Sequence, residues 1–164
     1  MKLSYWLSLA LLIVVLDQVT KQLAEHLLTY GERVAVVPSF NLTLLYNKGA
    51  AFSFLNDAGG WQRWFFTLIA VIVSTVIVFW LKAVGTEQRW TPAALVLILG
   101  GAIGNLIDRV LFGHVIDFIQ LYYKTFYWPA FNVADSAIVV GAGILLLSGW
   151  FLQPSKPTSE REMR

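Results

Sequence analysis

The sequence predicts a membrane protein with an all-α core of four transmembrane helices, a small extracytoplasmic β-sheet and an interfacial aromatic loop. The chain of 164 residues is 57% hydrophobic and 13% charged, whereas about a quarter of the residues of a soluble domain are charged. Four stretches approach the length of about 20 apolar residues that crosses a bilayer. A segment between the first two stretches alternates apolar and polar residues, which is typical of a strand. We expect a single membrane domain over residues 1–164.

The first predicted helix resembles the start of a signal peptide, because Lys2 precedes its apolar run. A signal peptide would end in a cleavage site of small residues, but Asp17 and Lys21 lie where that site would be. We therefore expect a retained helix. The predicted elements are helices at residues 3–23, 64–81, 92–110 and 131–152, outer loops at 24–63 and 111–130, and a tail at 153–164. The tail has no apolar face, and we expect it to be disordered.

The distribution of Lys and Arg residues predicts the orientation of the chain, because cytoplasmic segments are enriched in them. With four spans, the N-terminus, the loop at 82–91 and the tail at 153–164 share one side of the membrane, and they carry the higher density of Lys and Arg. We therefore expect both termini in the cytoplasm and the two long loops outside.

The first outer loop contains the strand signal, at residues 34–54. Pro38 and Gly49 interrupt its alternation. One face would carry Phe40, Leu42, Leu44 and Tyr46, and the other Asn41, Thr43 and Asn47. We expect a small sheet that lies on the outer membrane surface.

The second outer loop contains "QLYYKTFYWPAF", which is dense in aromatic residues. Aromatic side chains suit the membrane interface, where their rings are dry and their polar tips are wet. Two interpretations remain open for this loop: it anchors the protein at the interface, or it flanks a substrate.

Charged and amide residues interrupt the first and third apolar stretches. Asp17 and Lys21 are four residues apart on the first helix, so they share a face and are expected to pair. On the third helix, Gly100 and Gly104 form a small-xxx-small step that lets a neighbouring helix approach closely. Asn105, Asp108 and Arg109 follow at the outer end of that helix, either as a polar helix end or as partners for other helices and ligands.

Asp117 and Asp135 are two carboxylates in apolar surroundings near the outer membrane edge. Gly113 allows a turn after the third helix, so Asp117 would follow that helix and Asp135 would begin the fourth. Two carboxylates that lie close together in a low dielectric share one proton, and such a pair serves as general base and general acid. Alternatively, Asp135 caps the fourth helix. Both interpretations are compatible.

Several chemistries are unsupported by the sequence. The chain has no cysteine, which excludes disulfides and thiol catalysis. His26 and His114 lack a metal-ligand spacing, and we expect neither a metal nor another cofactor. The basic residues are scattered, so nucleic acid is not an expected partner.

Five motifs in order resemble the lipoprotein signal peptidase family, the signal peptidase II aspartic proteases of the bacterial cytoplasmic membrane. They are "DQVTK", "NKGAAFSF", "GGAIGNLIDRV", "GHVIDFI" and "FNVADS", spread over residues 17–136. The resemblance implies four membrane helices with a small extracytoplasmic sheet. It also implies an enzyme that cleaves prolipoproteins just before a cysteine that carries diacylglycerol.

The resemblance further implies roles for individual residues. Asp117 and Asp135 match the catalytic aspartates of the family, at the outer face of the inner membrane. The supporting polar residues of the family match Asp17, Asn47, Asn105, Asp108, Arg109 and Asn132. We expect Asn47 and Arg109 to hold the substrate backbone and Asn132 to steady the pair. The expected partners are a diacylglyceryl prolipoprotein, membrane lipid and inhibitors of the globomycin type.

Two other functions compete with this interpretation. A small proton-coupled transporter would also place Asp and Arg inside the membrane, although a proton path needs polar residues across the full depth. A non-catalytic scaffold would use its acidic residues only to pair helices.

Overall fold

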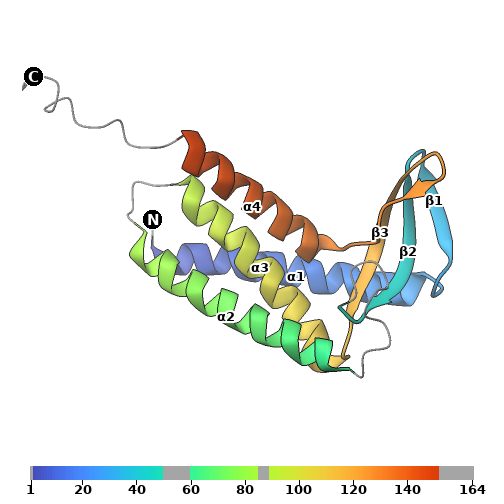
Figure 1. The fold of residues 1–164 in the computed structure, drawn as a ribbon, viewed down its shortest axis with the longest axis horizontal. Helices are drawn as coiled ribbons and strands as arrows, with labels where there is room; N and C mark the ends of the chain where they lie inside the picture. The colour runs from blue at the N-terminus through green and yellow to red at the C-terminus, as the bar shows by residue number, and fades with distance from the viewer. Residues whose placement is uncertain (1, 50–59, 85–88, 152–164) are drawn as a thin grey trace, which may run out of the picture.

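The computed structural model of the protein describes residues 2–49, 60–84 and 89–151. The tail at 153–164, for which we expect disorder, and residues 50–54 of the predicted strand segment lie outside this description. The described chain forms four helices and four strands (Figure 1). The helices are α1 (Leu3–Leu27), α2 (Trp61–Ala83), α3 (Trp90–Leu111) and α4 (Val133–Phe151), and the strands are β1 (Arg33–Val37), β2 (Phe40–Asn47), β3 (Val115–Tyr123) and β4 (Phe126–Tyr127).

Helices are present at all four predicted places, although their ends differ from the prediction. Three of them, α1, α2 and α3, are long and apolar enough to cross a membrane, and α4 is a further apolar helix. Helix α1 continues past the predicted residue 23 to Leu27, because Glu25 and His26 end the apolar stretch without ending the helix, for which Ala24 and Glu25 have a high propensity. The first predicted loop is correspondingly shorter than residues 24–63.

Helix α3 is the centre of the bundle and packs against the three other helices. Its small residues permit this arrangement, because a Cβ atom at Gly100 would lie 2.7 Å from Cβ of Ile13 on α1. A Cβ atom at Gly104 would likewise lie 2.5 Å from a carboxylate oxygen of Asp17. The predicted close approach of a neighbouring helix over Gly100 and Gly104 is confirmed.

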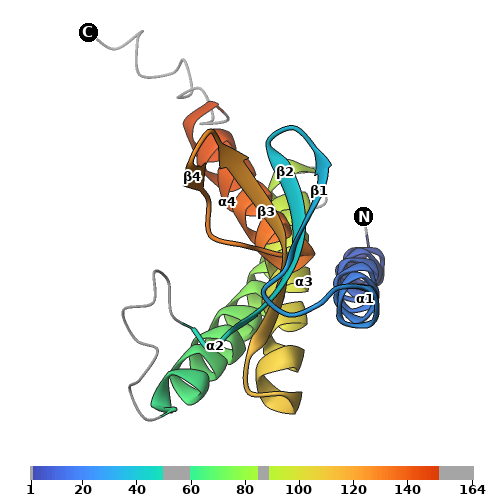
Figure 2. The same cartoon turned by 90° about the vertical axis from the view of Figure 1, so that its right-hand side faces the viewer.

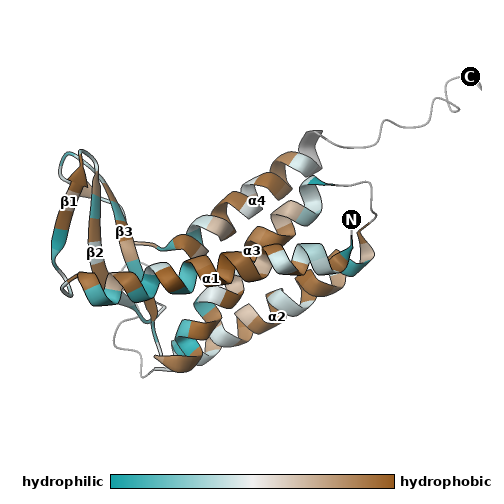
Figure 3. Cartoon of the chain, turned by 180° about the vertical axis from the view of Figure 1, so that it is seen from behind, coloured by the Kyte–Doolittle hydropathy of each residue, from teal (hydrophilic) through white to brown (hydrophobic). Residues whose placement is uncertain are grey.

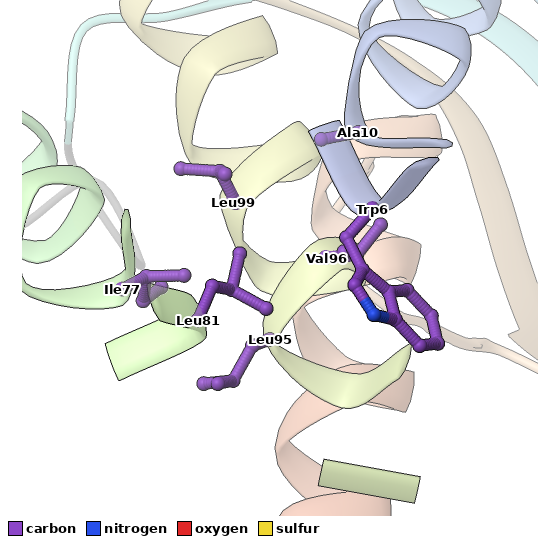
Figure 4. Close-up of a cluster of buried hydrophobic side chains, with 7 residues drawn as sticks. All are labelled: Trp6, Ala10, Ile77, Leu81, Leu95, Val96 and Leu99. Carbon is purple, nitrogen blue, oxygen red and sulfur yellow. The ribbon is translucent and has the colours of Figure 1, made fainter. Parts of the chain in front are cut away.

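The half of the bundle that includes the start of α1 has an apolar core. Helices α1, α2 and α3 contribute to one buried cluster (Figure 4), which consists of Trp6, Ala10, Ile77, Leu81, Leu95, Val96 and Leu99. Figure 3 shows α1 with hydrophobic colour along its middle and hydrophilic colour close to the sheet. The buried polar residues of α1, Asp17 and Lys21, belong to the half of that helix that lies close to the sheet.

The four strands form one antiparallel sheet in the order β1-β2-β3-β4. The sheet lies at the end of the bundle opposite the start of α1 (Figure 1), and Figure 2 shows β1, β2 and β3 side by side. The predicted alternation in β2 holds up to Leu42, and a register shift follows between Leu42 and Leu45. Before this shift the buried residues of β2 are the polar Asn41 and Thr43, and the apolar Leu44 that follows them is buried as well.

The prediction of a loop at residues 111–130 is wrong, because strands are present there. Most of this segment is the hairpin of β3 and β4, in which Tyr122 pairs with Tyr127. Its β-branched and aromatic residues favour strands, and β2 offers a hydrogen-bonding partner along most of β3. The turn that precedes β3 is as predicted, since Gly113 has a φ of 81°, which favours glycine.

Candidate active site

The sheet brings Asp117 and Asp135 together although they belong to different elements. Asp117 lies in β3, and the residues just before α4 pair with the same strand. The Ile119 amide donates to the Phe131 carbonyl at 2.8 Å, and the Phe131 amide donates to the Ile119 carbonyl at 2.9 Å. Because this pairing fixes the entry to α4, the first turn of that helix lies beside Asp117.

Asn132 contacts both aspartates. Its Oδ1 accepts a hydrogen bond from the Asp135 amide at 2.8 Å, and Asp135 Oδ2 accepts one from the Asn132 amide at 3.3 Å. This reciprocal pair is a capping box, in which Asn132 is the cap and Asp135 is the third residue of the helix. The predicted cap is thus present, but the capping residue is Asn132. The Asn132 side-chain amide also donates to Asp117 Oδ1 at 2.7 Å.

Asp117 is nearly inaccessible to solvent, with 3% of its surface exposed. Asn132 donates to one carboxylate oxygen, and Asn47 Nδ2 of β2 donates to the other at 3.0 Å. Burial, and after it the negative charge of Asp135, raises the pKa of Asp117 to about 7, against an ordinary value of 3.8. The two amide hydrogen bonds oppose this increase. Near neutral pH, a proton on Asp117 is therefore far more common than on an ordinary aspartate.

Asn105 of α3 connects Asp135 to the interior of the bundle. Its Nδ2 donates to Asp135 Oδ1 at 2.8 Å, and its Oδ1 accepts from Lys21 Nζ at 2.9 Å. The same oxygen accepts a longer hydrogen bond, of 3.3 Å, from Asn132 Nδ2. The Lys21 ammonium group can only donate, so the Asn105 atom that faces it is the oxygen Oδ1. The nitrogen Nδ2 of Asn105 therefore faces Asp135.

The predicted pair of Asp17 and Lys21 is confirmed, with Nζ 2.7 Å from Asp17 Oδ2. Lys21 also forms a second ion pair, 2.8 Å from Asp108 Oδ2, so Asp108 finds its partner across helices. All three residues have 0% exposed surface. Gln18 Nε2 donates to Asp108 Oδ1 at 2.8 Å. The result is a fully buried ion cluster, defined here as Asp17, Lys21 and Asp108.

Arg109 lies at the edge of this arrangement. Its guanidinium donates to the Asn105 carbonyl at 3.3 Å and lies 5.5 Å from the centre of the Phe66 ring of α2. Asn47, on the other side, accepts a hydrogen bond from the Gly49 amide at 2.8 Å. Both residues thus lie near the aspartates, while their expected contacts with a substrate stay a prediction.

A groove of about 590 Å³ adjoins Asp135 between α4 and the β3–β4 hairpin. Aromatic and aliphatic side chains form almost all of its wall, among them Tyr122, Phe126, Trp128, Phe131 and Val139. Asp135 is its one acidic lining residue among the described part of the chain. The site therefore combines an apolar groove with a carboxylate at its margin.

Sequence reasoning missed two contributions to this site. The prediction from the sequence does not include Gln18, which binds Asp108, and it gives Lys21 only one of its two carboxylate partners. The signal for both was the triplet of polar residues Asp17, Gln18 and Lys21 on one side of an otherwise apolar helix. In residues 2–49, 60–84 and 89–151, no group of three or more His, Cys, Asp or Glu side chains is arranged to hold a metal ion.

The chain matches known proteins along most of its length. The family model described as signal peptidase (SPase) II matches residues 9–151. A lipoprotein signal peptidase of Acinetobacter baumannii is 53% identical over 152 residues, which cover 93% of this chain and 86% of that one. A lipoprotein signal peptidase of Pseudomonas putida is 56% identical over 144 residues, covering 87% and 84%. That of Cupriavidus necator is 57% identical over 142 residues, covering 87% and 81%.

The fold agrees with these matches. A solved structure described as a bacterial membrane enzyme superimposes with a TM-score of 0.82 at 30% identity, covering 94% of this chain and 93% of that one. A second such structure gives a TM-score of 0.79 at the same identity, with coverages of 93% and 95%. The apolar helices, the sheet at one end and the extent of the match lead to one conclusion: this chain belongs to the signal peptidase II family, the lipoprotein signal peptidases.

Proposed function

We propose that this protein is a membrane aspartic endopeptidase that removes the signal peptide from diacylglyceryl-modified prolipoproteins, cleaving before the lipid-modified cysteine. The observation that carries the proposal is a pair of aspartates, Asp117 and Asp135, bound to the same asparagine. One of the pair is buried and has a pKa of about 7. Such a pair supplies a base and an acid at once.

In the proposed reaction the pair starts with one proton, which Asp117 holds. Asp135 takes a proton from a water molecule whose oxygen attacks the scissile carbonyl carbon, and Asp117 gives its proton to the carbonyl oxygen. The resulting diol collapses when Asp135 gives its proton to the leaving nitrogen and the C–N bond breaks. Asp117 regains a proton from a diol hydroxyl, so the products are a carboxylic acid and an amine, and the pair again holds one proton.

The apolar groove beside Asp135 suits a substrate that carries acyl chains. Its wall contains almost no polar group to compete for lipid, and apolar surface drives binding there. Asn47 and Arg109 would hold the substrate backbone beside the pair, and Asn132 and Asn105 would keep the carboxylates oriented. An inhibitor of the globomycin type would block the same pair.

We place the chain in the bacterial inner membrane with four spans, both termini in the cytoplasm and the aspartates at the outer face. Support comes from three helices of spanning length, the apolar helix α4 and the denser Lys and Arg residues on the side of the termini. Helix α1 begins and α4 ends at the end of the bundle away from the sheet (Figure 1). The transporter alternative has no support, since the half of the bundle away from the sheet has an apolar core.

The test compares Asp117→Asn and Asp135→Asn with the wild type in cleavage of a purified diacylglyceryl prolipoprotein. Each variant removes one proton-transfer group and keeps its shape, so we expect kcat to fall by at least about 1,000-fold. Glu32→Gln serves as the matched control, because Glu32 is exposed and far from the pair in the sequence. If either aspartate variant is folded and keeps wild-type turnover, the assignment of the pair is wrong.

A further inference from the structure

The buried ion cluster of Asp17, Lys21 and Asp108 supplies no reacting group in the proposed mechanism, and none of the three lines the groove. Its burial is complete. Charges that are removed from water carry a desolvation penalty of several kcal/mol each, and an apolar replacement of such a cluster is often neutral or stabilising. Stability alone is therefore a poor explanation for three buried charges at this position.

The remaining contacts of the two acidic members lead to the catalytic segments. Asp17 Oδ1 accepts a hydrogen bond from the Ala134 amide at 2.9 Å, and Ala134 directly precedes Asp135. Asp108 Oδ2 accepts one from the Ile116 amide at 3.2 Å, and Ile116 directly precedes Asp117. Each carboxylate thus holds the backbone one residue before a member of the pair.

Lys21 supplies a third connection. Its Nζ binds both carboxylates, so the two backbone attachments share one centre. The same nitrogen donates to Asn105 Oδ1, which leaves the Asn105 Nδ2 to donate to Asp135. A cation at this point therefore sets the positions of both segments and the side of the Asn105 amide that faces Asp135.

We propose that Asp17, Lys21 and Asp108 form a positioning clamp that sets the placement of Asp117 relative to Asp135. The clamp connects helices α1 and α3 to the two segments that carry the pair, namely β3 and the start of α4. Gln18 joins its acidic arms, since Nε2 donates to Asp17 at 3.3 Å and to Asp108 at 2.8 Å. This inference rests on the proposed function of the pair and assigns the three residues a role in geometry.

The first test compares Asp108→Ala with Asp108→Asn in the full-length enzyme. Alanine removes the attachment to Ile116, whereas the asparagine oxygen still accepts from Ile116 and Lys21 without the charge and only the hydrogen bond from Gln18 is lost. A misplacement of about 1 Å costs on the order of 100-fold in rate, so we expect that loss in kcat for the alanine variant with KM within about threefold of wild type. The asparagine variant should lose less than about tenfold, because the contacts with Ile116 and Lys21 persist.

Circular dichroism and size-exclusion chromatography in detergent measure the fraction of enzyme that is folded. The kcat values are then expressed per folded molecule. A clamp that only stabilises the fold would lower the folded fraction and leave kcat per folded molecule unchanged, which would overturn the proposal. Equal losses in kcat for both variants would overturn it too, because charge and not position would then be responsible.

Gly104→Ala is a second test that keeps every charge. The added Cβ would lie 2.5 Å from Asp17 Oδ2, so the carboxylate must move away from Lys21 and Ala134. We expect kcat to fall while KM changes little, and an unchanged kcat would contradict the clamp. The two proposals fail separately, since active Asp117→Asn enzyme would refute the catalytic pair, whereas inactive Asp117→Asn with fully active Asp108→Ala would refute the clamp alone.

Discussion

At the scale of single residues, the proposed chemistry depends on one carboxyl group whose surroundings disfavour its charge. Asp117 is buried next to Asp135, and the amides of Asn47 and Asn132, with the charge of Lys21, offset that environment in part. The sequence predicted the local pair of Asp17 and Lys21, because four residues along a helix define a common face. It could not predict the ion pair of Lys21 with Asp108, because that contact depends on how two helices pack.

The pKa of Asp117 predicts how activity depends on pH. The proposed mechanism needs a proton on Asp117, which is lost as the pH rises through about 7. We expect kcat/KM to fall about tenfold per pH unit on the alkaline side, since it reports the pKa values of the free enzyme. The measurement is the initial rate of prolipoprotein cleavage from pH 5 to 9, and a rate that stays constant between about pH 6.5 and 9 would contradict the assignment.

The same shift affects stability, with a definite sign. The folded protein raises the pKa of Asp117 from 3.8 to about 7, so the folded state binds the proton more tightly than the unfolded chain. The contribution of Asp117 to the free energy of unfolding is complete below about pH 4 and declines as the pH rises toward 7. The stabilising contribution of Asp117 is therefore smaller at neutral pH than at acidic pH.

At the scale of elements, one residue at the start of α4 both caps the helix and contacts the proposed catalytic pair. Asn132 begins the helix through its Oδ1 and contacts Asp117 through its Nδ2. Alternation in the sequence was enough to predict β2 but not β3. The run at Val115–Tyr123 is mostly apolar and aromatic, and its pairing with β2 and with Phe131 is a long-range contact.

Two substitutions of Asn132 separate its functions. A serine retains a capping oxygen, whereas alanine does not, and both lose the amide that donates to Asp117. We expect kcat to fall by a similar factor in Asn132→Ser and Asn132→Ala, on the order of 100-fold. The free energy of unfolding should be about 1 kcal/mol lower for alanine than for serine. Turnover and chemical denaturation in detergent measure the two quantities, and a serine variant with wild-type kcat would leave Asn132 with a capping role only.

At the scale of the whole molecule, polar and apolar cores occupy different ends of the bundle. The apolar cluster around Leu95 and Leu99 lies away from the sheet, and the ion cluster and the aspartates lie toward it. Hydropathy along the chain predicted the four helices, because each has a long apolar stretch. The arrangement of those helices around α3 depends on small residues such as Gly100, which the sequence indicated without identifying the helix that approaches.

Single cysteines test the proposed orientation, and the chain has no native cysteine to interfere. Thr125, between β3 and β4, should face the outside, and Lys2, just before α1, should face the cytoplasm. We expect a membrane-impermeant maleimide to label Thr125→Cys in intact spheroplasts but Lys2→Cys only after permeabilisation. The parent enzyme is the unlabelled control. Labelling of Lys2→Cys in intact spheroplasts would reverse the proposed topology.

The ion pair inside α1 has a consequence for biogenesis. Chains are made from the N-terminus onward, so α1 reaches the bilayer before α3 brings Asp108. A lone charge in a membrane helix costs about 2.5–3.5 kcal/mol on insertion scales, but Asp17 and Lys21 already lie 2.7 Å apart on one helix. Together they carry no net charge, so the helix enters lipid with its own counterion. The later arrival of Asp108 converts that neutral pair into the completed cluster.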